Sequence, residues 1–119
     1  MTTTTSQNTP AIFSNPDLFS GNLRVIMKDD EPWFVAKDVC LALGYNVKST
    51  GEVNVTNATR HLLPDEFTTA RISTGRGGAA TIISESGLYK LIMRSNKPVA
   101  KAFQDWVTRE VLPSIRKTG

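Results

Sequence analysis

Two pairs of short β-prone runs, each joined by turn-forming residues, constrain the fold of this sequence more than any other feature. In the first pair, Leu23, Val25 and Met27 share one side of an extended run, residues 29–30 supply a turn, and residues 32–35 resume the extended pattern. In the second pair, residues 67–73 and 79–83 flank the glycine-rich connector 74–78. Period-two hydrophobicity with turn residues between the runs is typical of antiparallel hairpins. Each pair therefore predicts one hairpin.

A short helix is predicted directly after the first hairpin. Residues 36–43 place their apolar side chains on one face, Asp38 lies near the positive N-terminal end of the helix, and Gly44 is suited to close it. Residues 45–59 are rich in Asn, Thr, Ser and Gly, and leave room for at most a helical turn.

Two further helices are predicted after the second hairpin. Ser84 or Ser86 is suited to cap the first of them, which has an apolar stripe of Leu88, Leu91 and Ile92. The second is expected to have Asn96 as its N-cap and Pro98 in its first turn, and Pro113 is expected to end or kink it. Its buried face is expected to contain Ala100, Phe103, Val107 and Val111, with Trp106 alongside. The fold class predicted is α+β: two antiparallel hairpins forming a small sheet, packed by a short helix and two C-terminal helices.

The 119 residues are enough for one domain, which we expect over residues 18–119. Residues 1–17 read as a flexible Thr/Ser-rich tail, although Ile12 and Phe13 are able to dock on the domain or on a second subunit. No apolar run approaches the roughly 20 residues that span a bilayer, and no signal peptide is recognisable. With a single cysteine, Cys40, the sequence indicates a reducing, cytoplasmic location.

Positive charge is concentrated in the C-terminal part of the chain. The formal net charge is +3, and residues 88–119 contain seven Lys or Arg against two acidic residues. Such asymmetry is expected of a surface that faces a polyanion. It is equally compatible with a basic helix that only faces solvent.

The residue types needed for a metal or catalytic site are scarce. A zinc site needs three or four converging ligands, and the chain has one cysteine and one histidine. Cys40 lies on an apolar stripe and is expected in the core, whereas His61 is interpreted as a partly buried core residue, a phosphate contact or, least favoured, a catalytic base. Residues 75–78 join two strands, so they do not match a P-loop, which runs from strand to helix. We therefore expect no enzyme, no metal and no cofactor.

The ordered blocks of residues 33–45, 85–92, 94–103 and 106–119 resemble the BRO-N family, the N-terminal domain of baculovirus BRO proteins and of phage or prophage antirepressors. The resemblance covers about residues 23–119 and implies DNA binding and transcriptional regulation of viral or lysogenic genes. It also implies a bacterial host cell of a phage or prophage, and a separate domain following this one. Residues 46–67 form the variable part of the family, so the resemblance says least about Lys48, Arg60 and Arg71.

Basic residues outside the apolar stripes are the candidates for contact with double-stranded DNA. Arg71 and Arg76 flank the hairpin connector, where Gly77 permits close approach of the backbone to phosphates. Phosphate contacts are expected from Lys48, Arg60, Lys97 and Lys101. We expect the Arg76 hairpin to form one positive face with the Lys97 and Lys101 helix start.

The alternative is a protein-interaction or dimerisation module that binds and inactivates a phage repressor. In that case Trp106 or Tyr89 is expected to point outward as an anchor. In the primary interpretation Phe103, Trp106 and Leu112 belong to the core, and an exposed stacking platform for bases is the minority interpretation.

Overall fold

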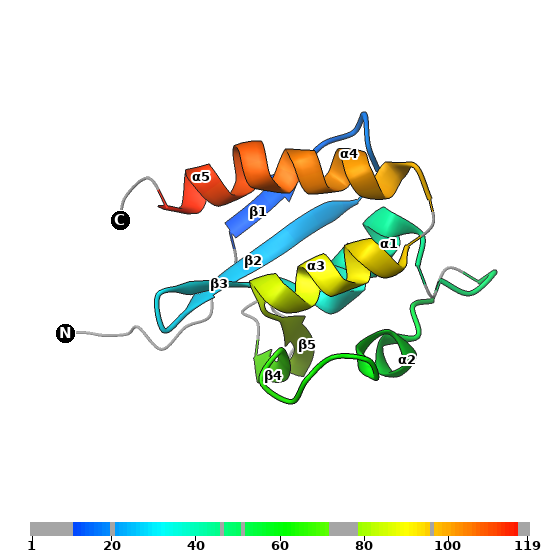
Figure 1. Ribbon diagram of the computed structural model, residues 1–119, viewed down its shortest axis with the longest axis horizontal. Helices are drawn as coiled ribbons and strands as arrows, with labels where there is room; N and C mark the ends of the chain where they lie inside the picture. Colours follow the sequence, from blue (N-terminus) through cyan, green and yellow to red (C-terminus); the bar gives the residue numbers. More distant parts are fainter. Residues whose placement is uncertain are drawn as a thin grey trace.

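The computed structural model describes residues 11–19, 21–45, 47–50, 52–71, 79–95 and 97–116. An antiparallel five-stranded sheet, in the order β1-β2-β3-β5-β4, carries helices on one face (Figure 1). The strands are β1 (Ala11–Ser14), β2 (Asn22–Lys28), β3 (Glu31–Val35), β4 (Phe67–Arg71) and β5 (Ala79–Ile83). The helices are α1 (Ala36–Leu43), α2 (Val55–Thr59), α3 (Glu85–Arg94), α4 (Val99–Trp106), the π-helical turn η1 (Val107–Val111) and α5 (Leu112–Arg116). The α+β prediction and both predicted hairpins are confirmed.

The turn between β2 and β3 consists of two residues in the left-handed region. Asp29 has φ 54° and Asp30 has φ 66°, and Lys28 pairs with Glu31 across them. Two consecutive positive φ angles give the turn a twist that matches the right-handed twist of the strands. Met27, next to this turn, is 48% exposed, so the expected buried face of β2 ends at Val25.

Strand β1 is the element that the composition did not reveal. Residues 11–14, which the sequence placed in a flexible tail, pair with β2, and Phe13 lies opposite Leu23. Phe13 packs against the main hydrophobic core, whereas Ile12 is exposed. A prediction from composition considers the entropy lost when a polar segment becomes ordered. Here the hydrogen bonds to β2 and the burial of the Phe13 ring offset that loss.

Alternation along the strands divides the apolar side chains between the two faces of the sheet. The face under the helices contributes Leu23, Val25, Phe34 and Ile83 to the main core. The other face carries a small cluster of buried Ile26, Val35 and Ile82. The helices therefore cover the face that holds most of the core.

Helix α1 continues from β3 and is tied to β2 by an ion pair. Asp38 accepts hydrogen bonds from the Arg24 backbone N–H (2.9 Å), Nε (2.8 Å) and Nη2 (2.9 Å). Gly44 closes the helix at φ 66°, as expected. Cys40 is buried in the core, also as expected, and burial raises the pKa of its thiol to about 12.

The two C-terminal helices follow the predicted stripes closely. The Ser84 hydroxyl caps α3 by accepting from the Gly87 N–H at 3.2 Å. Helix α4 starts at Val99 with Pro98 as its N-cap residue, one position before the expected first turn, and Asn96 lies outside the described residues. The predicted buried face of α4 is confirmed, and Trp106 and Phe103 make edge-to-face contacts with Phe19 at centroid distances of 5.7 and 6.0 Å.

Of the two outcomes expected for Pro113, a helix end and a kink, the end is not observed, and the helix geometry changes next to it instead, from η1 to α5. The chain turns through η1 into α5, which continues to Arg116. At the end of η1 the Leu112 N–H donates to the Val107 carbonyl, five residues back. In a regular α-helix the proline ring meets the carbonyl four residues back. The wider π turn changes this alignment, so the helix accommodates Pro113. No helix in the described ranges is both long and apolar enough to cross a membrane.

Candidate nucleic-acid interface

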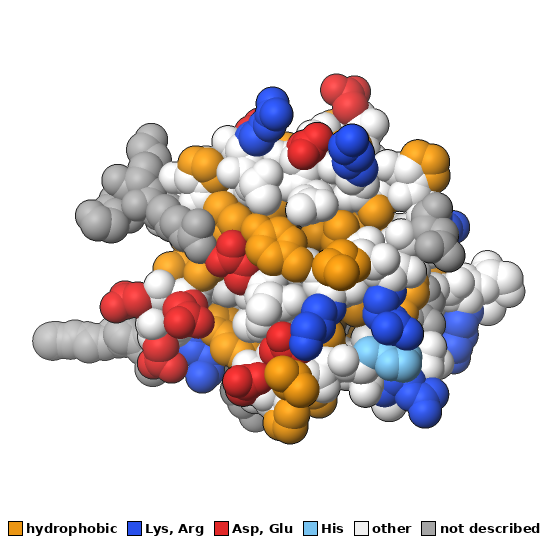
Figure 2. Space-filling view, viewed as in Figure 1, with side chains coloured by type: hydrophobic (Ala, Val, Ile, Leu, Met, Phe, Trp, Pro, Cys, Tyr) orange, Lys and Arg blue, Asp and Glu red, His pale blue; other side chains and the backbone are white. Residues whose placement is uncertain are grey.

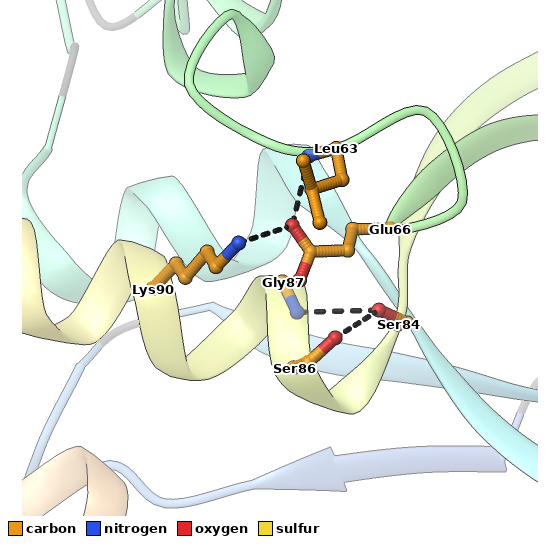
Figure 3. Close-up of polar contacts among 6 residues, drawn as sticks. All are labelled: Leu63, Glu66, Ser84, Ser86, Gly87 and Lys90. Carbon is orange, nitrogen blue, oxygen red and sulfur yellow. Dashed lines mark hydrogen bonds and ion pairs between the residues drawn. The ribbon is translucent and has the colours of Figure 1, made fainter.

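The segment between α2 and β4 is held against α3 by one buried carboxylate (Figure 3). Glu66 Oε1 accepts hydrogen bonds from Lys90 Nζ and from the Leu63 backbone N–H, both at 2.8 Å. The hydrogen bond from Lys90 and then that from Leu63 lower the pKa of Glu66. An ionised carboxylate therefore fixes this segment on the helix.

The missing side chain of Gly87 also allows the segment between α2 and β4 to lie close to α3. A Cβ at this position would lie 2.9 Å from the Glu66 carbonyl oxygen and 3.3 Å from Leu62 Cδ1. The Glu66 carbonyl also accepts the Ser84 N–H at 2.9 Å, at the start of α3. The segment thus contacts α3 at its cap, at Gly87 and at Lys90, which places residues 60 and 61 relative to the helix.

Four basic residues lie on the two segments that Glu66 joins, and we call them the basic patch: Arg60 and His61 directly after α2, and Lys90 and Arg94 on α3. Gly87, Lys90 and Arg94 are spaced three and four residues apart on α3, so Arg94 lies on the same side of the helix as the two residues that contact the segment before β4. Figure 2 shows Lys and Arg side chains gathered with the histidine over α2 and the end of α3. Acidic side chains gather on the opposite side of this view, over the β2–β3 turn and the start of α3.

The Arg60 and Arg94 side chains face solvent. Both are exposed, and no ion pair engages either of them within the described part of the chain. Arg60 donates to the neutral Asn57 Oδ1 at 3.2 Å. Arg94 in the last turn of α3 also stabilises the negative end of the helix dipole, which by itself explains a basic residue there.

His61 is exposed, so its interpretation as a core histidine is wrong. The interpretation of His61 as a phosphate contact stays a prediction. Sequence reasoning did not select Lys90 and Arg94 as site residues. Lys90 and Arg94 are four residues apart and lie outside the Leu88–Leu91–Ile92 stripe, which indicates that they share an exposed side of the helix. The contact between α3 and the segment after residues 60–61 could not be read from the sequence.

The other predicted site residues lie in different parts of the structure. Lys48 is exposed in a short loop closed by pairing of Val47 with Val53, and its Nζ lies 3.9 Å from Glu52 Oε1. Lys97 and Lys101 line one groove between α3 and α4. Arg71 ends β4 opposite Ala79, but its side chain, like Arg76 and Gly77, lies outside the described residues.

The expected face that joins the Arg76 hairpin to the start of α4 depends on a hairpin tip that lies outside the described residues, so it stays a prediction. Strand β4 is an edge strand of the sheet and lies at the bottom of the view in Figure 1, whereas α4 lies at the top. In the β4–β5 ladder, the pair Arg71 and Ala79 lies at the end opposite to Ile83, which is the last residue of β5 before α3.

The aromatic residues of α3 and α4 differ in exposure, with those of α4 buried and Tyr89 of α3 partly exposed. Phe103, Trp106 and Leu112 are buried, which confirms the core interpretation and contradicts both the stacking platform and an outward Trp106. Tyr89 is half-buried and its hydroxyl donates to Glu85 Oε2 at 3.1 Å. Across the described ranges, His, Cys, Asp and Glu side chains form no group of three suited to a metal ion.

Comparison with known proteins gives a match to the model of the BRO family, N-terminal domain, over residues 22–113. The putative Bro-N domain-containing protein 019R of Invertebrate iridescent virus 3 is 38% identical over 107 residues, 76% of this chain and 26% of that protein. An uncharacterized protein of Haemophilus influenzae is 39% identical over 100 residues, 82% of this chain and 46% of that protein.

An uncharacterized Bro-N domain-containing protein of Autographa californica nuclear polyhedrosis virus is 33% identical over 110 residues, 82% of this chain and 34% of that protein. The chain therefore spans between about a quarter and about a half of the length of these relatives. No solved structure matches it.

Proposed function

This chain belongs to the BRO family and carries its N-terminal domain, and from this premise we propose that it binds double-stranded DNA as the regulatory domain of an antirepressor-like viral or prophage protein. In this proposal the domain acts in the host cytoplasm by binding, without catalysing a reaction. The observation that carries it is the basic patch, in which Arg60 and Arg94 have no carboxylate partner among the described residues.

The patch suits a phosphate backbone for two reasons. Its side chains come from two segments that Glu66 and Gly87 hold in a fixed relation, so little ordering is needed on binding. A group of acidic side chains lies on the other side of the same face, over the β2–β3 turn, and this separation of charge helps to orient an approaching polyanion. Contacts of this kind supply affinity and position, whereas sequence is read by other groups. Arg76 stays our candidate for a base contact.

The test measures binding of a short random-sequence duplex by fluorescence anisotropy between about 50 and 200 mM salt. Arg94→Ala and Arg60→Ala are each expected to weaken binding and to reduce the salt slope by about 1, because each removes one phosphate contact. The matched control is Lys28→Ala, which loses the same charge beside Asp29 at the acidic side of the molecule.

Equal affinity and salt slope for wild type, Arg60→Ala, Arg94→Ala and Lys28→Ala would refute the proposed interface. An equal loss for all three variants would show that net charge alone, and not the patch, governs binding. Arg76→Ala, studied in the same way with a sequence selected from random duplexes, tests the base contact. Loss of preference with an unchanged salt slope is the expected result for it.

A further inference from the structure

A second surface, on the other side of α3, combines apolar and basic side chains. The groove between the end of α3 and the start of α4 has a volume of about 500 Å³. Met93, Pro98 and Ala100 contribute its apolar part, and Lys97, Lys101 and Gln104 contribute its polar part. We call it the α3–α4 groove.

Met93 is not needed for the packing of the domain. Its side chain is 80% exposed, the highest value among the large hydrophobic residues in the described ranges. The core stripe of α3 consists of Leu88, Leu91 and Ile92, and Met93 points away from it. A flexible, polarizable thioether adapts to partner side chains of different shape, which is why methionine is frequent on surfaces that bind peptides.

The charges along the groove have one sign. No carboxylate is among its lining residues, and within the described residues neither Lys97 nor Lys101 forms an ion pair. The Lys97 side chain lies against Gly44, with Cδ and Nζ 3.3 Å from the position that a Cβ would take there. Lys97 thus also faces the negative C-terminal end of α1, and Lys101 is the less constrained of the two lysines.

We infer that the α3–α4 groove binds an acidic, amphipathic segment of a partner protein. Apolar side chains of the segment cover Met93 and Pro98, and its carboxylates pair with Lys101 and Lys97. A DNA backbone satisfies the lysines but offers no apolar surface to Met93. Two copies meeting groove to groove bring lysines against lysines, which is unfavourable. This inference is independent of the DNA-binding proposal, because the groove and the basic patch use different residues.

The experiment selects random phage-displayed peptides on the immobilised full chain, and then measures the enriched peptides by fluorescence anisotropy. Enriched peptides are expected to alternate Asp or Glu with large apolar residues. Met93→Ser and Lys101→Glu are each expected to weaken binding at least about fivefold, the effect of a peripheral interface contact. Met27→Ser and Lys28→Glu are matched controls, since they make the same changes at another exposed methionine and lysine. All four positions are exposed, and thermal unfolding checks that each variant remains folded.

Three results would overturn the inference. The first is the absence of enriched acidic peptides, or peptides that bind Met93→Ser and Lys101→Glu as tightly as wild type. The second is displacement of the peptides by the random-sequence duplex, which would assign the groove to DNA. The third is self-association in sedimentation that Met93→Ser abolishes, which would assign it to a second copy. Unchanged DNA affinity of Met93→Ser separates this test from that of the basic patch.

Discussion

Replacement of Asp38 by alanine is expected to be among the most destabilising single changes in this domain. The carboxylate accepts three hydrogen bonds from Arg24, one of them from its backbone N–H. This N–H lies just beyond the last pair of the β2–β3 ladder, Val25 with Phe34, so Asp38 continues the ladder where β3 turns into α1. The Asp38 side chain is 7% exposed and that of Arg24 is 29% exposed.

The magnitude follows from what alanine leaves behind. Breaking a fully buried ion pair from one side costs about 3–5 kcal/mol, and a hydrogen bond to a charged group contributes about 1.5–3 kcal/mol. Because the Arg24 guanidinium is partly exposed, water replaces some of its lost interactions. We therefore expect Asp38→Ala to lower the free energy of unfolding by about 2–4 kcal/mol, a large part of the roughly 5–15 kcal/mol of a typical domain. Asp38→Asn keeps an acceptor and is expected to cost less.

The assay is urea unfolding followed by tryptophan fluorescence, in a double-mutant cycle of Asp38→Ala with Arg24→Leu. The two changes are expected to couple by more than about 1 kcal/mol, as contacting residues do. Lys48→Ala with Glu52→Ala is the matched control, an exposed pair at 3.9 Å that should couple by less than about 0.5 kcal/mol. A loss for Asp38→Ala below about 0.5 kcal/mol, or additivity of the cycle, would refute the reasoning.

Three further predictions concern α3 and the core. The pKa of Glu66 is lowered from 4.5, so the stability that its carboxylate contributes is present above that pH and is lost as the pH falls through the lowered pKa. When the free energy of unfolding is measured against pH, Glu66→Gln should reduce this acid-induced loss, and the same pH dependence as wild type would contradict the assignment. Cys40, with a pKa of about 12, should resist thiol reagents at pH 8 until urea unfolds the chain, and rapid labelling of the native protein would contradict its burial. Gly87→Ala should destabilise by about 1–3 kcal/mol in urea unfolding despite the better helix propensity of alanine, because its Cβ meets the Glu66 carbonyl at 2.9 Å; a gain in stability would contradict this.

Several elements of this fold are determined by sequence features that act over a few residues. The Asp29–Asp30 turn, the closing Gly44 and the Ser84 cap each depend on the backbone and hydrogen-bond preferences of one or two residues. The apolar stripes of α3 and α4 depend on periodicity alone. These features were predictable because each one is recorded in the residues that form it.

Other features were decided by contacts between distant segments. Strand β1 forms because its backbone hydrogen-bonds to β2 and Phe13 packs against the core. The polar composition of residues 1–17 does not indicate this pairing. The last helix passes Pro113 because η1 widens the turn before it, although proline by itself indicates a helix end.

The candidate site shows the same division. Basic residues were recognisable in the sequence, but which of them meet depends on how the segments pack. The segment that follows Arg60 and His61 is held on α3 because Glu66 bonds Lys90 and Gly87 leaves room for the Glu66 backbone, and neither contact could be read from the sequence. Charged residues follow no sequence pattern that predicts which of them meet in the folded chain. The sequence therefore determines how many positive side chains are available for a surface, and only tertiary packing determines where that surface forms.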